Sequence, residues 1–460
     1  MFRVTLTALT IALASIATAE TRVPQSQAEI SLGFAPLVKQ AAPAVVNIYA
    51  KRVVEVRDSP FGGDPFFQNL FRDFGQSRPR VQNSLGSGVI LSADGIVVSN
   101  YHVVGMSTDI RVHLNDRREY NARVLLADQE SDLAILQLEG ASDMPFLRLR
   151  DSDTVEVGEL VLAVGNPFGV GQTVSSGIVS GLARSGMATG NARGYFLQTD
   201  APINPGNSGG ALIDINGDLI GVNTSILTRS GGSNGIGFAI PASLVRQFVE
   251  QARAGQDAFQ RPWAGMFGQP VDADMAEGLG LERPGGIVIS ELHERSPFLE
   301  AGFRAGDVIL DVGGEPVNTP AEMIFRMSVA GIGQEVEVHA LKDGEMSVVP
   351  VRLIDAPEVP ARDTVTTGRK SSVPEMVLSN INPAVLGQFG LPLSLAGVVI
   401  ENPGPTGGRM GLRAGDVLLS IDEQAVGTTS EARDALRKAR GRVTIEIQRG
   451  NQRLVSRFRL

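Results

Sequence analysis

The segment "INPGNSGGALIDINGDLIGVN" at residues 203–223 combines a serine in a loop of small residues with a β-hairpin pattern. Glycines surround Ser208, and glycine lets a backbone turn tightly and direct its amide groups toward one point. Two apolar runs follow, and Asn216-Gly217 between them is typical of a tight turn between strands. The segment therefore raises two questions: whether this half of the chain is a β-protein, and whether Ser208 is a nucleophile.

The rest of the chain from Ala42 to Ile240 repeats the hairpin pattern. Short apolar runs are separated by glycine or asparagine turns, as in "GVILSADGIVVSN" at residues 88–100. A long helical period occurs near "ASLVRQFVEQARAG", at residues 242–255. Many short strands without alternating helices indicate antiparallel barrels or sandwiches, so a mostly β fold is predicted.

The C-terminal half contains an internal repeat, because "GFRAGDVILDVGGEPV" at 302–317 aligns with "GLRAGDVLLSIDEQAV" at 411–426. Each copy continues into a helix that begins with a capping box, Thr319 with Glu322 and Thr428 with Glu431. A hairpin follows each helix, through Asp343-Gly344 and Gly450-Asn451. Two small α+β modules are therefore predicted, at 262–355 and 374–460.

Three further segments lack these patterns. Residues 1–19 carry Arg3, an apolar run and small residues, which predicts a signal peptide cleaved after Ala19; the run is short for an uncleaved membrane anchor. Residues 55–82, inside the first domain at 20–257, form a long loop rich in glycine, proline and phenylalanine, either disordered or an interaction element. Residues 356–373 are proline-rich and polar, and predict a linker.

Composition excludes several classes of protein. The formal net charge of the 460 residues is -9, which argues against a general binder of nucleic acid or anionic membranes. An exported chain without cysteine has no disulfide or thiolate metal site. The four histidines show no metal-ligand spacing, so no metal and no cofactor is predicted.

A serine nucleophile needs a base, a group that orients the base, and amides for the developing oxyanion. His102 follows a strand end and is favoured as the base over His113, which lies in an alternating strand. Asp132 precedes a buried run and is favoured as the orienting carboxylate, with Asp151, Asp153 and Asp200 as rivals. The amides of Gly206, Asn207 and Ser208 are the predicted oxyanion donors. The order His, Asp, Ser is that of chymotrypsin-like enzymes.

Several motifs together resemble the HtrA (Deg) family of serine proteases with two PDZ domains. They are "SNYHVV", "ESDLAIL" and "INPGNSGGAL" around the three candidate residues, with "GNPFG" at 165–169 and "GIGFAIP" at 235–241. The resemblance covers the chain from about residue 34 to its end. It implies two perpendicular β-barrels with the active site between them, in an exported, periplasmic, ATP-independent endopeptidase that degrades misfolded proteins. A holdase chaperone or a protease with one signalling substrate are the alternatives.

The resemblance also implies binding sites and partners. Ile203 and Ile226 fall where the family lines its primary specificity pocket, and the loop with Phe66, Phe67 and Phe71 resembles the regulatory loop. "RPWAGM" resembles the carboxylate-binding loop of the first PDZ domain, which assigns Ala264, Gly265 and Met266 to binding C-terminal peptides. The second PDZ domain shows no clear equivalent, so peptide binding or a role in assembly are both open there.

Homo-oligomers, as trimers or multiples of trimers, are implied as well. The arginine-rich stretch from Arg433 to Arg459 is interpreted as a solvated surface, with contact to anionic envelope components as the alternative.

Overall fold

The computed structural model describes residues 33–57, 77–105, 107–166, 171–185, 195–204, 206–226, 235–439 and 441–459. The predicted signal peptide and the phenylalanines of the long loop lie outside the described residues. Within the described residues, no helix is both long and apolar enough to cross a membrane.

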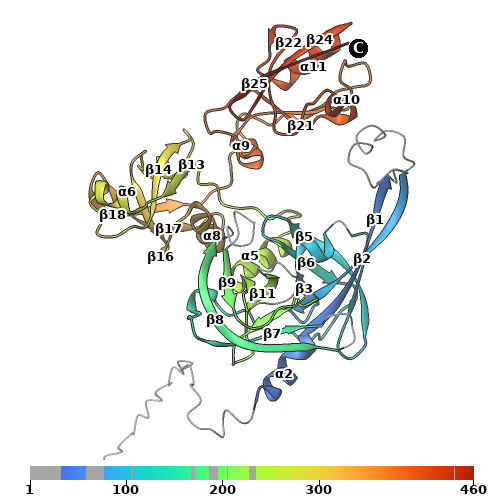
Figure 1. Ribbon diagram of the computed structural model, residues 1–460, viewed down its shortest axis with the longest axis vertical. Coiled ribbons are helices and arrows are strands. Elements are labelled where there is room, and N and C mark those ends of the chain that lie inside the picture. The colour runs from blue at the N-terminus through green and yellow to red at the C-terminus, as the bar shows by residue number, and fades with distance from the viewer. Residues whose placement is uncertain are drawn as a thin grey trace, which may run out of the picture.

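Two closed six-stranded barrels form the N-terminal half, and they lie against each other in the blue-to-green part of Figure 1. The strand order is β1-β2-β3-β6-β5-β4 in the first barrel and β10-β11-β12-β9-β8-β7 in the second. All pairings within both barrels are antiparallel, which confirms the predicted mostly β fold. The strands are β1 (Val45–Arg57), β2 (Ser77–Ile90), β3 (Ile96–Ser99), β4 (Asp109–His113), β5 (Glu119–Asp128), β6 (Leu133–Leu138), β7 (Leu160–Gly165), β8 (Thr173–Ser185), β9 (Tyr195–Thr199), β10 (Ala211–Ile213), β11 (Leu219–Ile226) and β12 (Gly237–Pro241).

The hairpin turns fall where the sequence placed them. Gly217 sits between β10 and β11 with a φ of 86°, and Gly95 sits between β2 and β3 with the same value, a conformation that glycine adopts at little cost. The loop predicted at 55–82 is shorter at both ends, because β1 continues to Arg57 and β2 begins at Ser77. Among the described residues, three α-helices accompany the barrels: α2 (Ala35–Ala41), α4 (Tyr101–Val104) and α5 (Ala242–Arg253).

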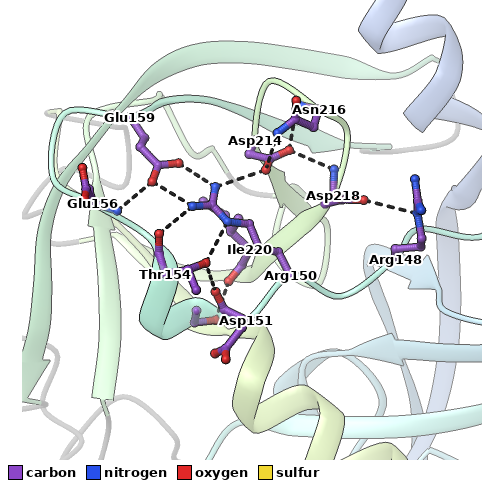
Figure 2. Close-up of polar contacts among 11 residues, drawn as sticks. Arg148, Arg150, Asp151, Thr154, Glu156, Glu159, Asp214, Asn216, Asp218 and Ile220 are labelled. Atoms are coloured by element: carbon purple, nitrogen blue, oxygen red, sulfur yellow. Dashed lines mark hydrogen bonds and ion pairs between the residues drawn. The ribbon is translucent and has the colours of Figure 1, made fainter. Parts of the chain in front are cut away.

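Arg150, in the segment that connects the two barrels, is held by two carboxylates of the second barrel (Figure 2). Its guanidinium donates to both oxygens of Glu159, at 2.7 and 2.9 Å, and to Asp214 at 3.2 Å. Asp214 directly follows β10 and is almost completely buried, so its charge depends on Arg150 for compensation. This cluster joins the connecting segment to the strand that follows the Ser208 loop.

The C-terminal half consists of two modules, each a sheet packed against helices (yellow and orange-red in Figure 1). The first sheet has the order β13-β14-β15-β17-β18, and the second has the order β19-β20-β21-β22-β24-β25. The first module contains β13 (Met266–Pro270), α6 (Ala273–Leu279), β14 (Ile287–Leu292), α7 (Pro297–Glu300), β15 (Val308–Val312), β16 (Glu315–Pro316), α8 (Pro320–Ala330), β17 (Glu335–Lys342) and β18 (Glu345–Arg352). The second contains β19 (Val365–Thr366), β20 (Val377–Asn380), α9 (Pro383–Phe389), β21 (Val398–Asn402), α10 (Gly404–Arg409), β22 (Val417–Ile421), β23 (Gln424–Ala425), α11 (Thr429–Lys438), β24 (Arg442–Arg449) and β25 (Gln452–Arg459).

The predicted helix starts in the repeat are confirmed, with one difference between the copies. Thr428 caps α11 with a complete capping box to Glu431. Thr319 caps α8 in the same way, but the Glu322 carboxylate accepts from the amide of Asn318, one residue earlier, at 2.6 Å. Both arrangements satisfy amide groups that the first turn of a helix leaves without partners.

Helix α8 of the first module packs directly on the second barrel. The Phe325 ring stacks on Tyr195 with the centroids 3.8 Å apart and the planes at 8°, and Phe325 is 4% exposed. The neighbouring Arg326 bonds Asp153, and it also donates to the Tyr195 hydroxyl at 3.0 Å. Burial raises the pKa of Tyr195 to about 12, so this phenol stays protonated at neutral pH. The first module is therefore fixed to the N-terminal half through α8.

Candidate active site

His102 and Asp132 are brought together at the edge of the first barrel. His102 lies on α4, directly after β3, and Asp132 lies in the turn before β6. The Asp132 carboxylate accepts from Nδ1 of His102 at 2.8 Å and from the His102 amide at 3.0 Å. Its backbone carbonyl accepts from the Tyr101 amide at 3.1 Å. These contacts fix the imidazole and leave Nε2 facing away from the carboxylate, as a base requires.

Thr224 on β11 links this pair to the second barrel. Its hydroxyl donates to Oδ2 of Asp132 at 2.6 Å, and its carbonyl accepts from Oγ of Ser208 at 3.0 Å. One residue therefore contacts both ends of the candidate triad. Sequence reasoning missed Thr224, because no motif marks a threonine that reaches the site from a neighbouring strand.

The Ser208 hydroxyl is bonded to the Thr224 carbonyl in this structure, and no hydrogen bond among the described residues joins it to His102. The His102 side chain is 51% exposed, whereas that of Asp132 is 21% exposed. The imidazole is thus open to an incoming substrate while its carboxylate partner is shielded. A rotation of the Ser208 side chain would be needed to bring its hydroxyl to Nε2.

The loop around Ser208 is held from the first barrel by Ser87 on β2. The Ser87 amide donates to the carbonyl of Ser208 at 2.9 Å, and the Ser87 hydroxyl donates to the carbonyl of Gly206 at 2.7 Å. That hydroxyl also accepts from the Asn166 amide at 2.8 Å. Gly209 lies so close that a Cβ there would come within 2.1 Å of the Ser87 carbonyl oxygen. Only glycine fits at this position, which explains the second glycine of the motif.

The three predicted oxyanion donors differ in their hydrogen bonds. The amide of Asn207 donates to the carbonyl of Asn204 at 3.0 Å, inside the loop. The amides of Gly206 and Ser208 donate to no acceptor among the described residues. Two donors separated by one residue are therefore free to bind an oxyanion.

The alternative candidates for the base and for the orienting carboxylate take part in other contacts. His113 stands against Tyr49 and lies 3.8 Å from Glu119. Asp151 accepts from Ser243 at 2.9 Å, and Asp200 accepts from the Ile178 amide at 2.7 Å. Asp153 belongs to the Arg326 contact described above. None of these four side chains is hydrogen-bonded to His102 among the described residues.

The proposed pocket residues lie beside each other on the second barrel. Ile203 is 2% exposed and packs against Gly237, because a Cβ added to Gly237 would lie 2.8 Å from Cδ1 of Ile203. Gly237 on β12 is the cross-strand partner of Ile226 on β11. The side chain of Ile226 lies outside the described residues.

The predicted carboxylate-binding loop of the first module precedes β13 and is fastened at its carbonyl groups. The carbonyl of Ala264 accepts from the Ser296 hydroxyl at 2.7 Å, and that of Gly265 accepts from the His293 amide at 2.8 Å. Gly265 has a φ of 61° and lies under the Trp263 ring. A groove runs past this loop and Ile324 of α8, and among the described strands β13 pairs with β14 alone, at the edge of its sheet.

No group of three or more histidine, aspartate or glutamate side chains is arranged to hold a metal ion in the part of the chain that the structure describes.

The two barrels with the serine, histidine and aspartate at their junction define a trypsin-like serine protease. Comparison with protein-family models agrees, since residues 86–222 match the trypsin-like peptidase domain. Residues 265–353 and 400–449 each match a PDZ domain.

Curated proteins and solved structures extend this likeness over most of the chain. The periplasmic pH-dependent serine endoprotease DegQ of Escherichia coli K12 is 36% identical over 428 residues, covering 91% of this chain and 90% of the relative. A probable periplasmic serine endoprotease, DegP-like, of Halomonas elongata is 37% identical over 411 residues, covering 85% of each chain. The solved HtrA-type protease AlgW with decapeptide is 35% identical, with a TM-score of 0.52, covering 71% of this chain and 99% of AlgW. The chain belongs to the HtrA (Deg) family of periplasmic serine endoproteases.

Proposed function

We propose that Ser208 is the nucleophile of this protease, with His102 as the base and Asp132 as the orienting group. The observation that carries the assignment is the continuous set of contacts from His102 through Asp132 and Thr224 to Ser208. The Ser208 hydroxyl would attack the scissile carbonyl while Nε2 of His102 takes its proton. The same proton passes to the leaving amine, and water then hydrolyses the acyl-enzyme through the same base.

The oxyanion hole in this proposal consists of the amides of Gly206 and Ser208. The Asn207 amide, predicted as a third donor, serves instead to close the loop onto Asn204. Loss of one such donor typically costs about 10²- to 10³-fold in rate. The loop geometry therefore matters as much as the triad itself.

The proposed substrates are unfolded or misfolded polypeptides of the periplasm, cut after small aliphatic residues. The buried Ile203 supports a shallow, apolar pocket, and Ile226 would complete it. The first PDZ domain would bind C-terminal peptides through Ala264, Gly265 and Met266, by adding a strand to β13. Export after cleavage at Ala19, and assembly into trimers or multiples of trimers, are parts of the same proposal.

Replacing Ser208 with alanine tests the nucleophile. Cleavage of unfolded casein by Ser208→Ala should fall to background, because losses of about 10⁶-fold accompany removal of a serine nucleophile. Persistent cleavage would refute the assignment, whereas loss of cleavage with retained suppression of aggregation would reveal a separate chaperone activity.

Replacing Asp132 with asparagine tests the orienting group. Asp132→Asn should fold normally and its cleavage rate should fall by about 10⁴-fold, since the imidazole would adopt the wrong tautomer. Activity close to wild type would instead assign the orienting role to another carboxylate.

A further inference from the structure

The two PDZ domains differ at the edge of the sheet where such domains take peptides. In the first, β13 is an edge strand, and α8 lies alongside it. In the second, β20 is the counterpart of β13 and α11 is the counterpart of α8, but β20 is no longer at the edge. The strand β19, from the proline-rich segment predicted to be a linker, pairs with it.

The added segment runs in the direction of a bound peptide. Val365 pairs with Leu378 and Thr366 with Val377, so the pairing is antiparallel. The amide of Asn380, at the far end of β20, donates to the carbonyl of Arg362 at 2.8 Å. Residues 361–367 therefore lie along the whole of β20, with Thr367 near its beginning. A C-terminal peptide that adds to a PDZ sheet places its last residue at that same end.

Thr367 occupies the loop that would receive a terminal carboxylate. Its carbonyl accepts from the amide of Glu375 at 2.9 Å, and its hydroxyl accepts from the amide of Met376 at 2.9 Å. The same hydroxyl donates to the carbonyl of Val373 at 2.5 Å. Two amides of the loop thus bind two oxygens of one residue, as they would bind the two oxygens of a carboxylate.

The two loops also share their backbone conformation. Glu375 has a φ of 62°, close to the 61° of Gly265 in the first domain. A positive φ is unusual for glutamate, and it indicates that the surrounding contacts impose this conformation on the second loop. The equivalence was hidden in the sequence because a glutamate stands where the first domain has glycine.

The side chains of the segment alternate between the groove and solvent. Val365 packs against the apolar core that contains Leu378 of β20 and Leu436 of α11. Thr366 is exposed, and Thr367 is 2% exposed. The backbone of α11 is joined to the same region, since the Leu436 carbonyl accepts from the Ser372 amide at 3.1 Å.

From these contacts we infer that the second PDZ domain holds residues 361–367 of its own chain as an internal peptide ligand. The groove between β20 and α11 is closed to C-terminal peptides while this segment stays in place. A ligand on the same chain competes at an effective concentration in the millimolar range, which exceeds that of ordinary free peptides. The first PDZ domain is then the peptide receptor of the resting protein, and the second fixes the chain that joins them.

The test uses the full chain with Ser208→Ala, to prevent self-cleavage, and the free heptapeptide of residues 361–367 ending in a carboxylate. Val365→Asp places a charge against the core and should release the segment, whereas Thr366→Asp adds the same charge on the exposed face. Hydrogen exchange by mass spectrometry follows the amides of residues 375–380. We expect them to be protected in the parent and in Thr366→Asp, to exchange at least about tenfold faster in Val365→Asp, and to regain protection when the heptapeptide is added.

Fast exchange of the amides of residues 375–380 in the parent would overturn the inference. It would also be overturned if the added heptapeptide increased the protection of these amides in the parent, which carries no Val365→Asp substitution. If the amides of β24 and β25 also exchange faster in Val365→Asp, the whole second PDZ domain is unfolded in that variant. A second variant then tests whether the segment is docked. The chain has no cysteine, so Thr366→Cys with Val377→Cys introduces a single pair at directly opposed positions. Quantitative disulfide formation under mild oxidation supports the docked segment, and a pair that stays reduced refutes it.

Discussion

Single side chains outside the sequence motifs decide how the proposed catalytic groups of this protease meet. Thr224 donates to the Asp132 carboxylate and accepts from the Ser208 hydroxyl, so it contacts the proposed orienting group and the proposed nucleophile together. Ser87 holds the carbonyl groups of Gly206 and Ser208 from the opposite barrel. Both residues act on the geometry of the site, and neither is expected to react with substrate.

Thr224→Val removes the hydroxyl and keeps the shape of the side chain. A hydrogen bond to a charged group contributes about 1.5–3 kcal/mol, so kcat/KM for a peptide substrate should fall by roughly 10- to 100-fold. Thr224→Ser retains the hydroxyl and should recover most of that loss. Equal activities for the valine and serine variants would show that the bond to Asp132 does not support catalysis. Thermal melting of both variants checks that the barrels remain folded.

The sequence predicted His102, Asp132 and Ser208 because each sits in a local pattern that can be read without the fold. Thr224 and Ser87 could not be predicted in this way. Their roles arise where the barrels meet, and Ser87 reaches Gly206 across 119 positions of the chain. The same limit applies to Asn207, whose amide is directed inward by a carbonyl three residues earlier.

At the level of elements, the cluster around Arg150 ties the connecting segment to β10 and so to the Ser208 loop (Figure 2). Burial acts to raise the pKa of Glu159, but hydrogen bonds from Arg150 and the Glu156 amide outweigh it and lower this pKa below its usual value. A carboxyl whose pKa is depressed on folding stabilises the protein above its unfolded pKa. That stabilisation is lost as the pH falls through the folded pKa.

Glu159→Gln should therefore destabilise the protease at pH 7 by about 1–3 kcal/mol, and by progressively less below pH ~4. Urea unfolding at pH 7 and at pH 3.5 measures the difference. Glu156→Gln is the matched control, because Glu156 is exposed and should have little effect at either pH. A penalty for Glu159→Gln that is the same at both pH values would exclude the ion pair with Arg150 as its origin.

Elements with strong local signals were predicted well, and the hairpins through Gly217 and Asp343-Gly344 and the start of α11 are confirmed. The strand β19 was missed. Its segment is polar and follows prolines, and it lacks the alternation by which strands are recognised. It becomes a strand because β20 offers an unpaired edge and a groove for Val365. Tertiary contacts thus overrode local preference at this point.

On the scale of the whole molecule, the first PDZ domain is fixed to the protease through Phe325 and Arg326 of α8. Phe325 belongs to the same buried cluster as the core of the second barrel. The repeat in the sequence predicted two α+β modules, the family resemblance implied that they are PDZ domains, and the family comparisons confirm both domains. The repeat gave no indication that α8 packs on the second barrel. Its counterpart α11 has a stripe of alanine and leucine and does not pack on another domain among the described residues.

Phe325→Ala should loosen this attachment, since removing a buried phenylalanine ring costs about 3–5 kcal/mol at a packed site. Amides of α5 and β9 should exchange faster, and the linkage near residues 254–262 should become more sensitive to added protease. Phe267→Ala is the control, because Phe267 belongs to the same domain but is 43% exposed on β13. Equal effects of the two variants would show that the stack with Tyr195 does not hold the domain in place.

Pairing of β19 with β20 shortens the linker between the two PDZ domains. The sequence of residues 356–373 is typical of an eighteen-residue flexible linker. Residues 361–367, however, lie along β20 in the groove of the second PDZ domain. Ile354 still accepts a hydrogen bond from Trp263 of the first module, and Glu358 and Pro360 accept from Asn382 of the second. The span between these contacts is residues 355–357, and three residues reach at most about 11 Å when fully extended. The volume that the second domain can explore is correspondingly small. Release of β19 would lengthen the tether and enlarge that volume severalfold, without a change in any domain's fold.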